Sequence, residues 1–162
     1  MLISKKYLKQ QRQLHKGTYG VSGDKYANYV LESGFKDILD YGCGARLLET
    51  ELGFAINNYD PAIKGLEENN KPHDFVYCGD VLEHIEPEFL DNVLADLSRC
   101  MKVSGLLVIS TVKAEKHLPD GRNAHLIIEN ADWWRNKLLK HFKITQEQIK
   151  PKEYMAWVLA IG

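Results

Sequence analysis

The sequence has few cysteines and no long hydrophobic run, and each absence excludes a class of protein. Its 162 residues include only Cys43, Cys78 and Cys100, an odd number without the short paired spacings of zinc sites. We therefore expect reduced thiols rather than a disulfide framework or a structural metal. No segment approaches the roughly 18 apolar residues of a membrane helix, and residues 1–16 are basic and glutamine-rich, without the apolar core of a signal peptide. These absences predict a cytoplasmic protein that does not enter a membrane.

The sequence also lacks a large excess of positive or negative charge. The 21 basic and 22 acidic residues leave a net charge of -1, which removes the overall attraction to phosphate on which many nucleic-acid binders rely. The distribution is uneven, because residues 1–25 carry a net charge of +5 and the remainder carries -6. This basic N-terminal arm is either a local anion-facing surface or the solvated face of a helix.

What is present is the composition of an ordinary soluble domain, with 44% hydrophobic and 27% charged residues. The length suits one domain over residues 1–162. We expect a helical cap and connector at residues 1–34 and a sheet core at residues 35–162.

Short apolar runs alternate with segments of helical spacing. The predicted strands span residues 35–40, 54–60, 75–81 and 106–111, and the predicted helices span residues 3–15, 47–52, 87–103 and 131–141. This alternation predicts an α/β fold with a mostly parallel, doubly wound sheet. Two further β-rich segments, residues 142–149 and 154–161, predict a C-terminal antiparallel strand pair.

Polar residues at the ends of the predicted strands form the candidate site, because ligands of open α/β sheets bind beyond the carboxyl ends of the strands. Gly42 and Gly44 follow the first strand and permit a tight turn close to a ligand. Asp60 ends the second strand, where a carboxylate can accept hydrogen bonds from ribose hydroxyls. The pattern describes a slot for a nucleoside. The dinucleotide fingerprint G-x-G-x-x-G fails at Leu47, which disfavours NAD.

The string Ile38-Leu39-Asp40-Tyr41-Gly42-Cys43-Gly44 resembles the D-x-G-x-G motif of class I (Rossmann-like) S-adenosylmethionine-dependent methyltransferases. Asp60, 16 residues beyond Gly44, stands about where that family keeps its ribose-binding carboxylate. Residues 80–85 are similar to the segment after the third motif strand in quinol and other small-molecule O-methyltransferases. The likeness covers roughly residues 35–112. The whole chain is also similar to short methyltransferase-like chains of bacteria and bacteriophages.

The resemblance implies S-adenosylmethionine as cofactor, a Rossmann-like sheet and a reaction that needs no metal. The residues that it places at the cofactor are Asp40, Gly42, Cys43, Gly44, Asp60, Gly79 and Asp80.

Two departures from the family pattern change this expectation. The family usually inserts another strand after the ribose carboxylate, with an acidic residue beside the adenine. Here the gap from Asp60 to Asp74 leaves no room for it, so we expect a sheet shortened by one strand and its flanking helices. Adenine recognition then falls to Asp80 or to backbone groups of Cys78 and Gly79. In addition, Arg46 stands where the family often has a small residue.

Histidines and two polar connectors supply the candidates for contact with the acceptor. The connectors, residues 15–23 and 113–125, are expected to roof the carboxyl edge of the sheet, where loops carry specificity. His84 is a candidate general base because imidazole titrates near neutrality, and its alternative role is to orient the preceding loop. The remaining candidates are His125 as a second catalytic residue and His15, Tyr19 and Arg122 as substrate-binding residues.

The function that these residues favour is methyl transfer from S-adenosylmethionine to an oxygen or nitrogen of a small-molecule or glycan acceptor. One alternative is a nucleic-acid methyltransferase whose basic N-terminal arm tracks phosphates. Methylation of base amino groups is disfavoured, because residues 79–82 read Gly-Asp-Val-Leu where such enzymes have N/D-P-P-Y/F/W. A second alternative is a binding protein that keeps the cofactor fold without catalysis. The oligomeric state is left open.

Overall fold

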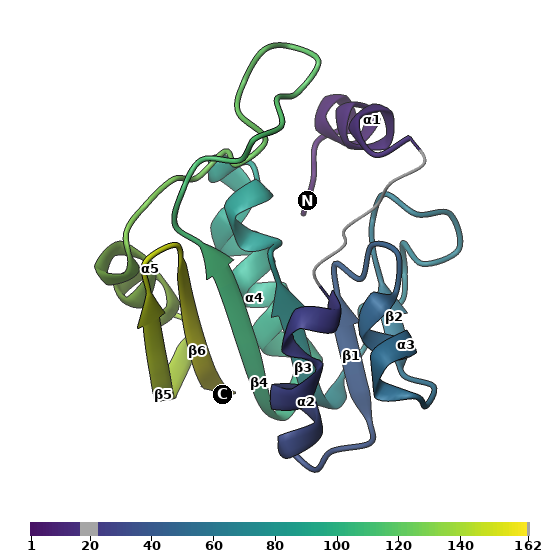
Figure 1. Cartoon of the computed structure of the whole chain (residues 1–162), viewed down its shortest axis with the longest axis vertical. Coiled ribbons are helices and arrows are strands. Elements are labelled where there is room, and N and C mark those ends of the chain that lie inside the picture. The colour runs from purple at the N-terminus through teal and green to yellow at the C-terminus, as the bar shows by residue number, and fades with distance from the viewer. Residues whose placement is uncertain (17–22, 162) are drawn as a thin grey trace.

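The computed structural model describes residues 1–16 and 23–161 (Figure 1). Its helices are α1 (Lys5–Leu14), α2 (Ala27–Glu32), α3 (Leu47–Leu52), α4 (Leu90–Cys100) and α5 (Ala131–Leu138). Its strands are β1 (Ile38–Tyr41), β2 (Asn57–Tyr59), β3 (His73–Gly79), β4 (Met101–Ser110), β5 (Phe142–Lys150) and β6 (Glu153–Ala160). Short 3-10 turns cover Gly23–Tyr26, Leu82–His84 and Pro87–Phe89.

The strands form one sheet in the order β2-β1-β3-β4-β6-β5. The first four are parallel, and β6 runs antiparallel to both β4 and β5. This confirms the predicted α/β class and the C-terminal antiparallel pair. It also confirms the shortened sheet, since β2 is an edge strand and residues 60–72 contain only turns.

Alternating side chains along the strands build two cores on opposite faces of the sheet. Ile38 and Tyr77 point to the face that α2 and α3 cover, where they pack with Val30 and Leu48. Leu39, Val76 and Leu107 lie on the other face in the core that includes side chains of α4 and α5. Because helices cover both faces, the carboxyl ends of the parallel strands are left as the edge from which a ligand can approach (Figure 1).

Two predicted element boundaries are wrong, the end of the helix before β4 and the extent of the second strand. Residues 101–105 were expected to end a helix, but α4 ends at Cys100 and β4 begins at Met101. Pairing with β3 explains the early start, because Met101 aligns with His73 and buries its side chain. The strand around residues 54–60 is shorter than expected, because β2 is limited to the three residues that align with β1.

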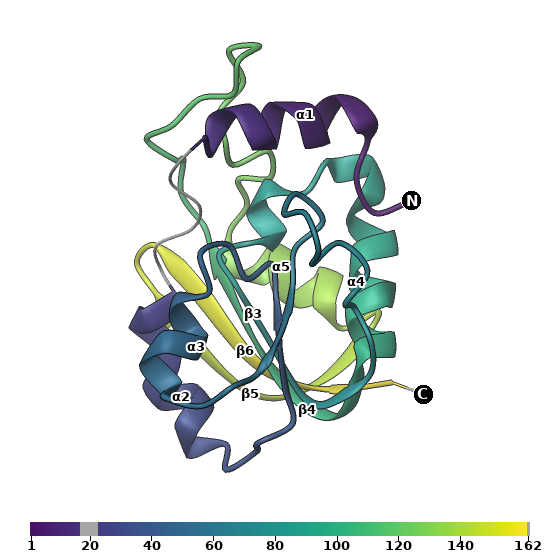
Figure 2. The same cartoon turned by 90° about the vertical axis from the view of Figure 1, so that its right-hand side faces the viewer.

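Helix α1 lies across the carboxyl ends of the strands rather than against either face of the sheet (Figure 2). Ser4 begins it, and its side-chain oxygen accepts a hydrogen bond from the backbone N–H of Tyr7. The polar stretch of residues 113–125 rises beside α1 at the same end of the molecule (Figures 1 and 2). Every helix within the described residues is too short or too polar to cross a bilayer.

Candidate functional site

A cavity lies where the glycine turn after β1 faces α1, open on one side to solvent. Its wall contains six residues that the sequence pointed to, namely His15, Gly42, Gly44, Asp60, Asp80 and His84. It also contains Ile3, Tyr7 and Gln11 of the N-terminal segment, which the sequence did not point to. The site is therefore built between the sheet edge and α1.

The turn after β1 requires glycine at its first position. Gly42 has φ +84°, and a Cβ atom added there would lie 2.4 Å from Cγ2 of Val81. The N–H groups of Gly42 and Cys43 both donate to the carbonyl oxygen of Tyr59, at 2.7 and 3.0 Å. These contacts hold the turn against β2 and leave backbone, rather than side chain, facing the cavity.

Asp60 closes the same turn from the end of β2. Its Oδ2 accepts a hydrogen bond from the N–H of Gly44 at 3.2 Å, and its Oδ1 accepts one from the N–H of Ala62 at 2.8 Å. Burial raises the pKa of this carboxyl, and the two N–H donors act against that shift. A carboxylate that still has free lone pairs is thus fixed in the cavity wall, as recognition of vicinal hydroxyls requires.

Asp40 and Asp80 add two further carboxyl groups at the ends of β1 and β3. Asp40 is buried beneath the turn, and desolvation together with the charge of Asp60 raises its pKa to about 7. Asp80 lies in the cavity wall with φ +54°, an uncommon conformation for a residue with a side chain. Its backbone N–H donates to the carbonyl oxygen of Val108 at 2.9 Å.

The two histidines predicted as catalytic lie side by side. Their rings meet edge to face with centroids 4.7 Å apart. Nδ1 of His84 lies 2.8 Å from the carbonyl oxygen of Ala124, and Nδ1 of His125 lies 2.6 Å from that of Val112. Because a carbonyl oxygen can only accept, each Nδ1 carries the proton and each Nε2 holds a lone pair in the neutral ring. Burial, followed by the neighbouring His125, lowers the pKa of His84 to about 4.

Glu83 is a buried acid beside this pair that the sequence analysis did not single out. Its Oε1 accepts a hydrogen bond from the N–H of Ser110 at 3.1 Å, while its Oε2 has no hydrogen-bond partner among the residues that the structure describes. Burial, followed by the charge of Asp80, raises its pKa to about 8, so the acid is protonated at neutral pH. The sequence offered one signal for Glu83, namely a charged residue directly after the apolar Leu82.

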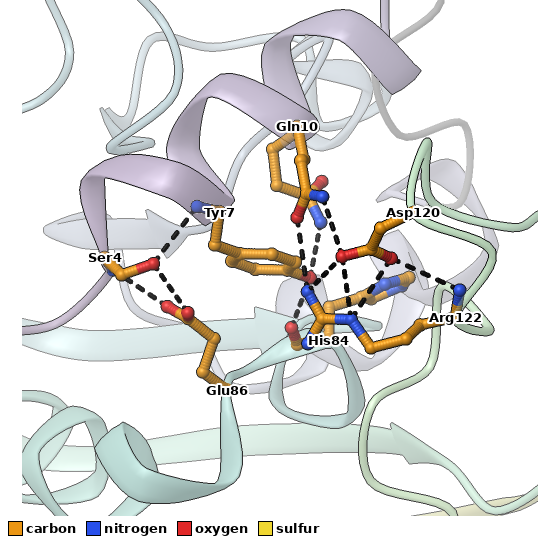
Figure 3. A network of polar contacts seen from close by, with 8 residues as sticks. Ser4, Tyr7, Gln10, His84, Glu86, Asp120 and Arg122 are labelled. Carbon is orange, nitrogen blue, oxygen red and sulfur yellow. Dashed lines mark hydrogen bonds and ion pairs between the residues drawn. The ribbon is translucent and has the colours of Figure 1, made fainter.

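Hydrogen bonds from α1 and the loop of residues 113–125 join into one roof over the cavity (Figure 3). The hydroxyl of Tyr7 donates to the carbonyl oxygen of His84 at 2.5 Å. Gln10 donates to Asp120 at 2.8 Å, and the guanidinium of Arg122 bonds both Asp120 and Oε1 of Gln10. Both connectors were expected to roof the site, and the described part of each lies at this end.

The structure gives some predicted residues a different setting from the expected one. Arg122 is committed to Asp120 and Gln10, so the geometry supports a role in holding α1, and its contact with substrate stays a prediction. The predicted site residues that do not line the cavity are, within the described part of the chain, Asp40, Cys43, Gly79, Arg122 and His125. Tyr19 lies outside the described residues.

One group of side chains has the composition of a metal-ligand set. Potential ligand atoms of Glu83, His84 and His125 lie within 4.8 Å of one another, and no other such group occurs in the described parts of the chain. For comparison, the bond between a zinc ion and a nitrogen or oxygen ligand is about 2.0–2.2 Å long. The expectation that no metal takes part stays a prediction.

Comparison with known sequences decides the family. The sequence model of the methyltransferase domain matches residues 20–150. The chain belongs to this methyltransferase domain family. A ubiquinone biosynthesis O-methyltransferase of Rickettsia bellii is 30% identical over 55% of this chain and 50% of its own length. The chain thus spans about half the length of the curated relatives that it matches.

Solved structures agree with this methyltransferase fold. A 1,6-didemethyltoxoflavin N1-methyltransferase of Burkholderia thailandensis, solved with S-adenosylhomocysteine, is 15% identical with a TM-score of 0.60 over 87% of this chain and 79% of its own. Magnesium protoporphyrin IX methyltransferase of Synechocystis PCC 6803, also solved with S-adenosylhomocysteine, is 15% identical with a TM-score of 0.58 over 96% and 95%. The predicted family, fold class and S-adenosylmethionine as its cofactor are confirmed.

Proposed function

We propose that this chain transfers the methyl group of S-adenosylmethionine to a hydroxyl or amine of a small-molecule acceptor. The observation that carries the proposal is the cavity in which the glycine turn, Asp60 and the neutral His84 share one wall. The relatives support the choice of acceptor class, since a ubiquinone precursor, a toxoflavin precursor and a magnesium porphyrin are all small molecules.

The residues present fit the cofactor. At Gly42 the space beside Val81 excludes even a Cβ atom, so backbone alone lines that part of the cavity. Asp60 is held by two backbone N–H groups in the orientation that ribose hydroxyls need. Asp80 lies in the cavity wall and Asp40 is buried at the end of β1, and a carboxyl group at either place favours a ligand with cationic centres. We assign the ribose to Asp60 and the methionine end to the turn with Asp40 and Asp80.

Bound S-adenosylmethionine supplies an electrophilic methyl carbon whose bond to sulfur breaks with its electron pair left on sulfur. The chain must align the acceptor opposite that bond and take the proton that the acceptor loses. His84 is suited to the second task, because the Ala124 carbonyl fixes its proton on Nδ1 and leaves the Nε2 lone pair available. A pKa of about 4 keeps the ring neutral at physiological pH, ready to accept. As the oxygen or nitrogen bonds to the methyl carbon, its proton passes to Nε2.

The roof favours an acceptor with apolar surface. Ile3, Tyr7 and Ile85 present hydrocarbon to the cavity. The polar groups of the facing loop are engaged elsewhere, since Arg122 pairs with Asp120 and the Asn123 side chain bonds the backbone of Ala114. A phenol or a related flat, hydroxyl-bearing molecule therefore suits the cavity.

The test is methyl transfer from S-adenosylmethionine with a tritiated methyl group to a panel of catechols, hydroxybenzoates and aromatic amines. We expect at least one phenolic acceptor to gain label. His84→Gln should lose roughly a hundredfold or more of the rate while S-adenosylhomocysteine binds as before, since general-base groups typically supply that factor. His117→Gln, at an exposed histidine of the same end, is the matched control. Cofactor binding without transfer to any acceptor would instead support the binding-protein alternative.

A further inference from the structure

The adenine base lacks its usual partner in this fold, and the structure offers a replacement. Residues 60–72 contain only turns and β2 is the edge of the sheet, so the strand that carries an acidic residue beside the adenine is missing. Another element has to enclose the base if the cofactor binds as proposed above.

A second cavity adjoins the first at the place where a base would lie. Pro61, Val81 and Ile85 are among the residues that line both cavities, so the two spaces are continuous at these side chains. Pro61 directly follows Asp60, the residue that we assign to the ribose. A base attached to that ribose therefore borders the residues that the two cavities share.

The second cavity has the chemistry of a site for a flat, apolar ring with one polar edge. Its lining includes Tyr59 and Tyr41, whose ring centroids are 4.6 Å apart, and Leu2 and Ile3 of the N-terminal segment. The single charged group in the described wall is Glu86. An aromatic base can lie against such aromatic and apolar side chains and direct one polar group at this carboxylate.

Glu86 is held ready to accept one more hydrogen bond. Only 8% of the residue is exposed. Its Oε2 accepts the backbone N–H of Ser4 at 2.8 Å and its Oε1 accepts the Ser4 hydroxyl at 2.6 Å (Figure 3). A carboxylate has about four acceptor positions, so two stay available. The exocyclic amine of adenine donates two hydrogens and no other part of the base does, which matches an acceptor-only group.

We propose that Glu86, together with the Leu2–Ile3 segment that α1 holds in place, forms the adenine subsite of this chain. The inference rests on the proposed cofactor function. The first turn of α1 thereby replaces the missing strand, and it couples the order of α1 to cofactor binding, because the same serine that begins the helix fixes the carboxylate.

The test compares two nucleosides by calorimetry on the full chain, S-adenosylhomocysteine and S-inosylhomocysteine, whose base bears a carbonyl oxygen in place of the amine. The parent protein should prefer the adenosyl compound by roughly ten- to hundredfold, because the carbonyl oxygen would face a carboxylate. Glu86→Gln replaces one acceptor by an amide that can donate to the carbonyl, so the preference should fall below threefold. Glu88→Gln, at an exposed carboxylate two residues away, should leave it unchanged.

A second variant keeps the inference testable if Glu86→Gln unfolds. Leu2→Trp would fill the second cavity, whose wall contains Leu2 while that of the first does not, and it should weaken S-adenosylhomocysteine binding by more than tenfold without changing the thermal midpoint by more than a few degrees. Equal binding of the two nucleosides by the parent, or an undiminished preference in Glu86→Gln, would overturn the adenine subsite alone. If the parent binds neither nucleoside, the proposed function fails with it.

Discussion

The rings of His84 and His125 meet edge to face with centroids 4.7 Å apart, and each ring is fixed by a backbone carbonyl at Nδ1. The pair comes from segments 41 residues apart, the turn after β3 and the loop after β4. His125 reaches the site through His84 rather than through the cavity wall. We therefore regard His84 as the base and His125 as the residue that tunes and positions it.

Replacing His125 tests this division of roles. His125→Phe keeps a ring against His84 but removes the neighbouring imidazole, which is the second cause of the lowered pKa of His84 after burial. The pKa of His84, followed by NMR of its ring protons, should rise from about 4 toward its ordinary value. The acid limb of the methyl-transfer rate should move to higher pH with it. An unchanged His84 titration in the variant would show that His125 does not tune the base.

The affinity for the cofactor should depend on pH through Asp40. Its pKa of about 7 means that half of the free protein carries this carboxyl protonated at neutral pH, whereas the ammonium group of S-adenosylhomocysteine favours the ionised form. Binding of S-adenosylhomocysteine should thus be roughly tenfold weaker at pH 6 than at pH 8. Asp40→Asn should flatten this dependence, and Asp132→Asn, at an exposed carboxylate of α5, should preserve it. A flat profile in the parent would exclude Asp40 from cofactor recognition.

The sequence predicted those parts of the molecule that depend on short stretches of chain. The glycine turn was predictable because Gly42 must adopt a positive φ beside Val81, and Asp60 because it ends the neighbouring strand. The α/β class followed from the alternation of strands and helices, and the shortened sheet followed from the short gap after Asp60. These features need only local conformation and the rules that govern parallel sheets.

Features that join distant segments could not be predicted in this way. The bond from Tyr7 to the carbonyl of His84 and the pairing of Arg122 with Gln10 connect residues 77 and 112 positions apart. Arg122 stood out as a free cation in a polar loop, and only the fold shows that Asp120 and Gln10 engage it. The start of β4 at Met101 was missed for a related reason, because pairing with β3 overrides the helical spacing that runs through that position.

The free energy of unfolding should depend on pH through the buried acid Glu83. Its pKa is about 8 in the folded protein against an ordinary value of 4.5, so the folded state keeps a proton that the unfolded state releases between these values. Stability from this group is therefore lost as pH rises from about 4.5 to 8. Glu83→Gln cannot lose that proton. Its free energy of unfolding relative to the parent should increase by roughly 1–4 kcal/mol between pH 5 and pH 8.5.

Urea unfolding at the two pH values makes this comparison, with Glu129→Gln, at an exposed carboxylate, as the control. A difference between Glu83→Gln and the parent that does not change with pH would show that Glu83 is ionised in the folded state.

Loss of the Arg122 side chain should make α1 more mobile without preventing cofactor binding. Arg122→Ala removes the contacts that tie Gln10 of α1 to the facing loop, so amide hydrogen exchange in Lys5–Leu14 should accelerate several-fold. Affinity for S-adenosylhomocysteine should stay within about threefold, and methyl transfer should fall. Arg135→Ala breaks a comparable pairing, with Glu147 and Asp132 on the far side of the sheet, and should not affect α1. If amide hydrogen exchange in α1 does not change, the result would instead support the prediction that Arg122 contacts the substrate directly.

The most direct test of the account is the calorimetric affinity of the purified chain for S-adenosylhomocysteine, measured for the parent and for Asp60→Ala. Loss of a carboxylate that accepts ribose hydroxyl bonds should cost about 1.5–3 kcal/mol. We expect saturable binding with one site per chain, and we expect the variant to bind roughly ten- to hundredfold more weakly while its circular dichroism stays that of the parent. A parent that does not bind, or an Asp60→Ala variant that binds as tightly as the parent, would contradict the assignment of this cavity to the cofactor.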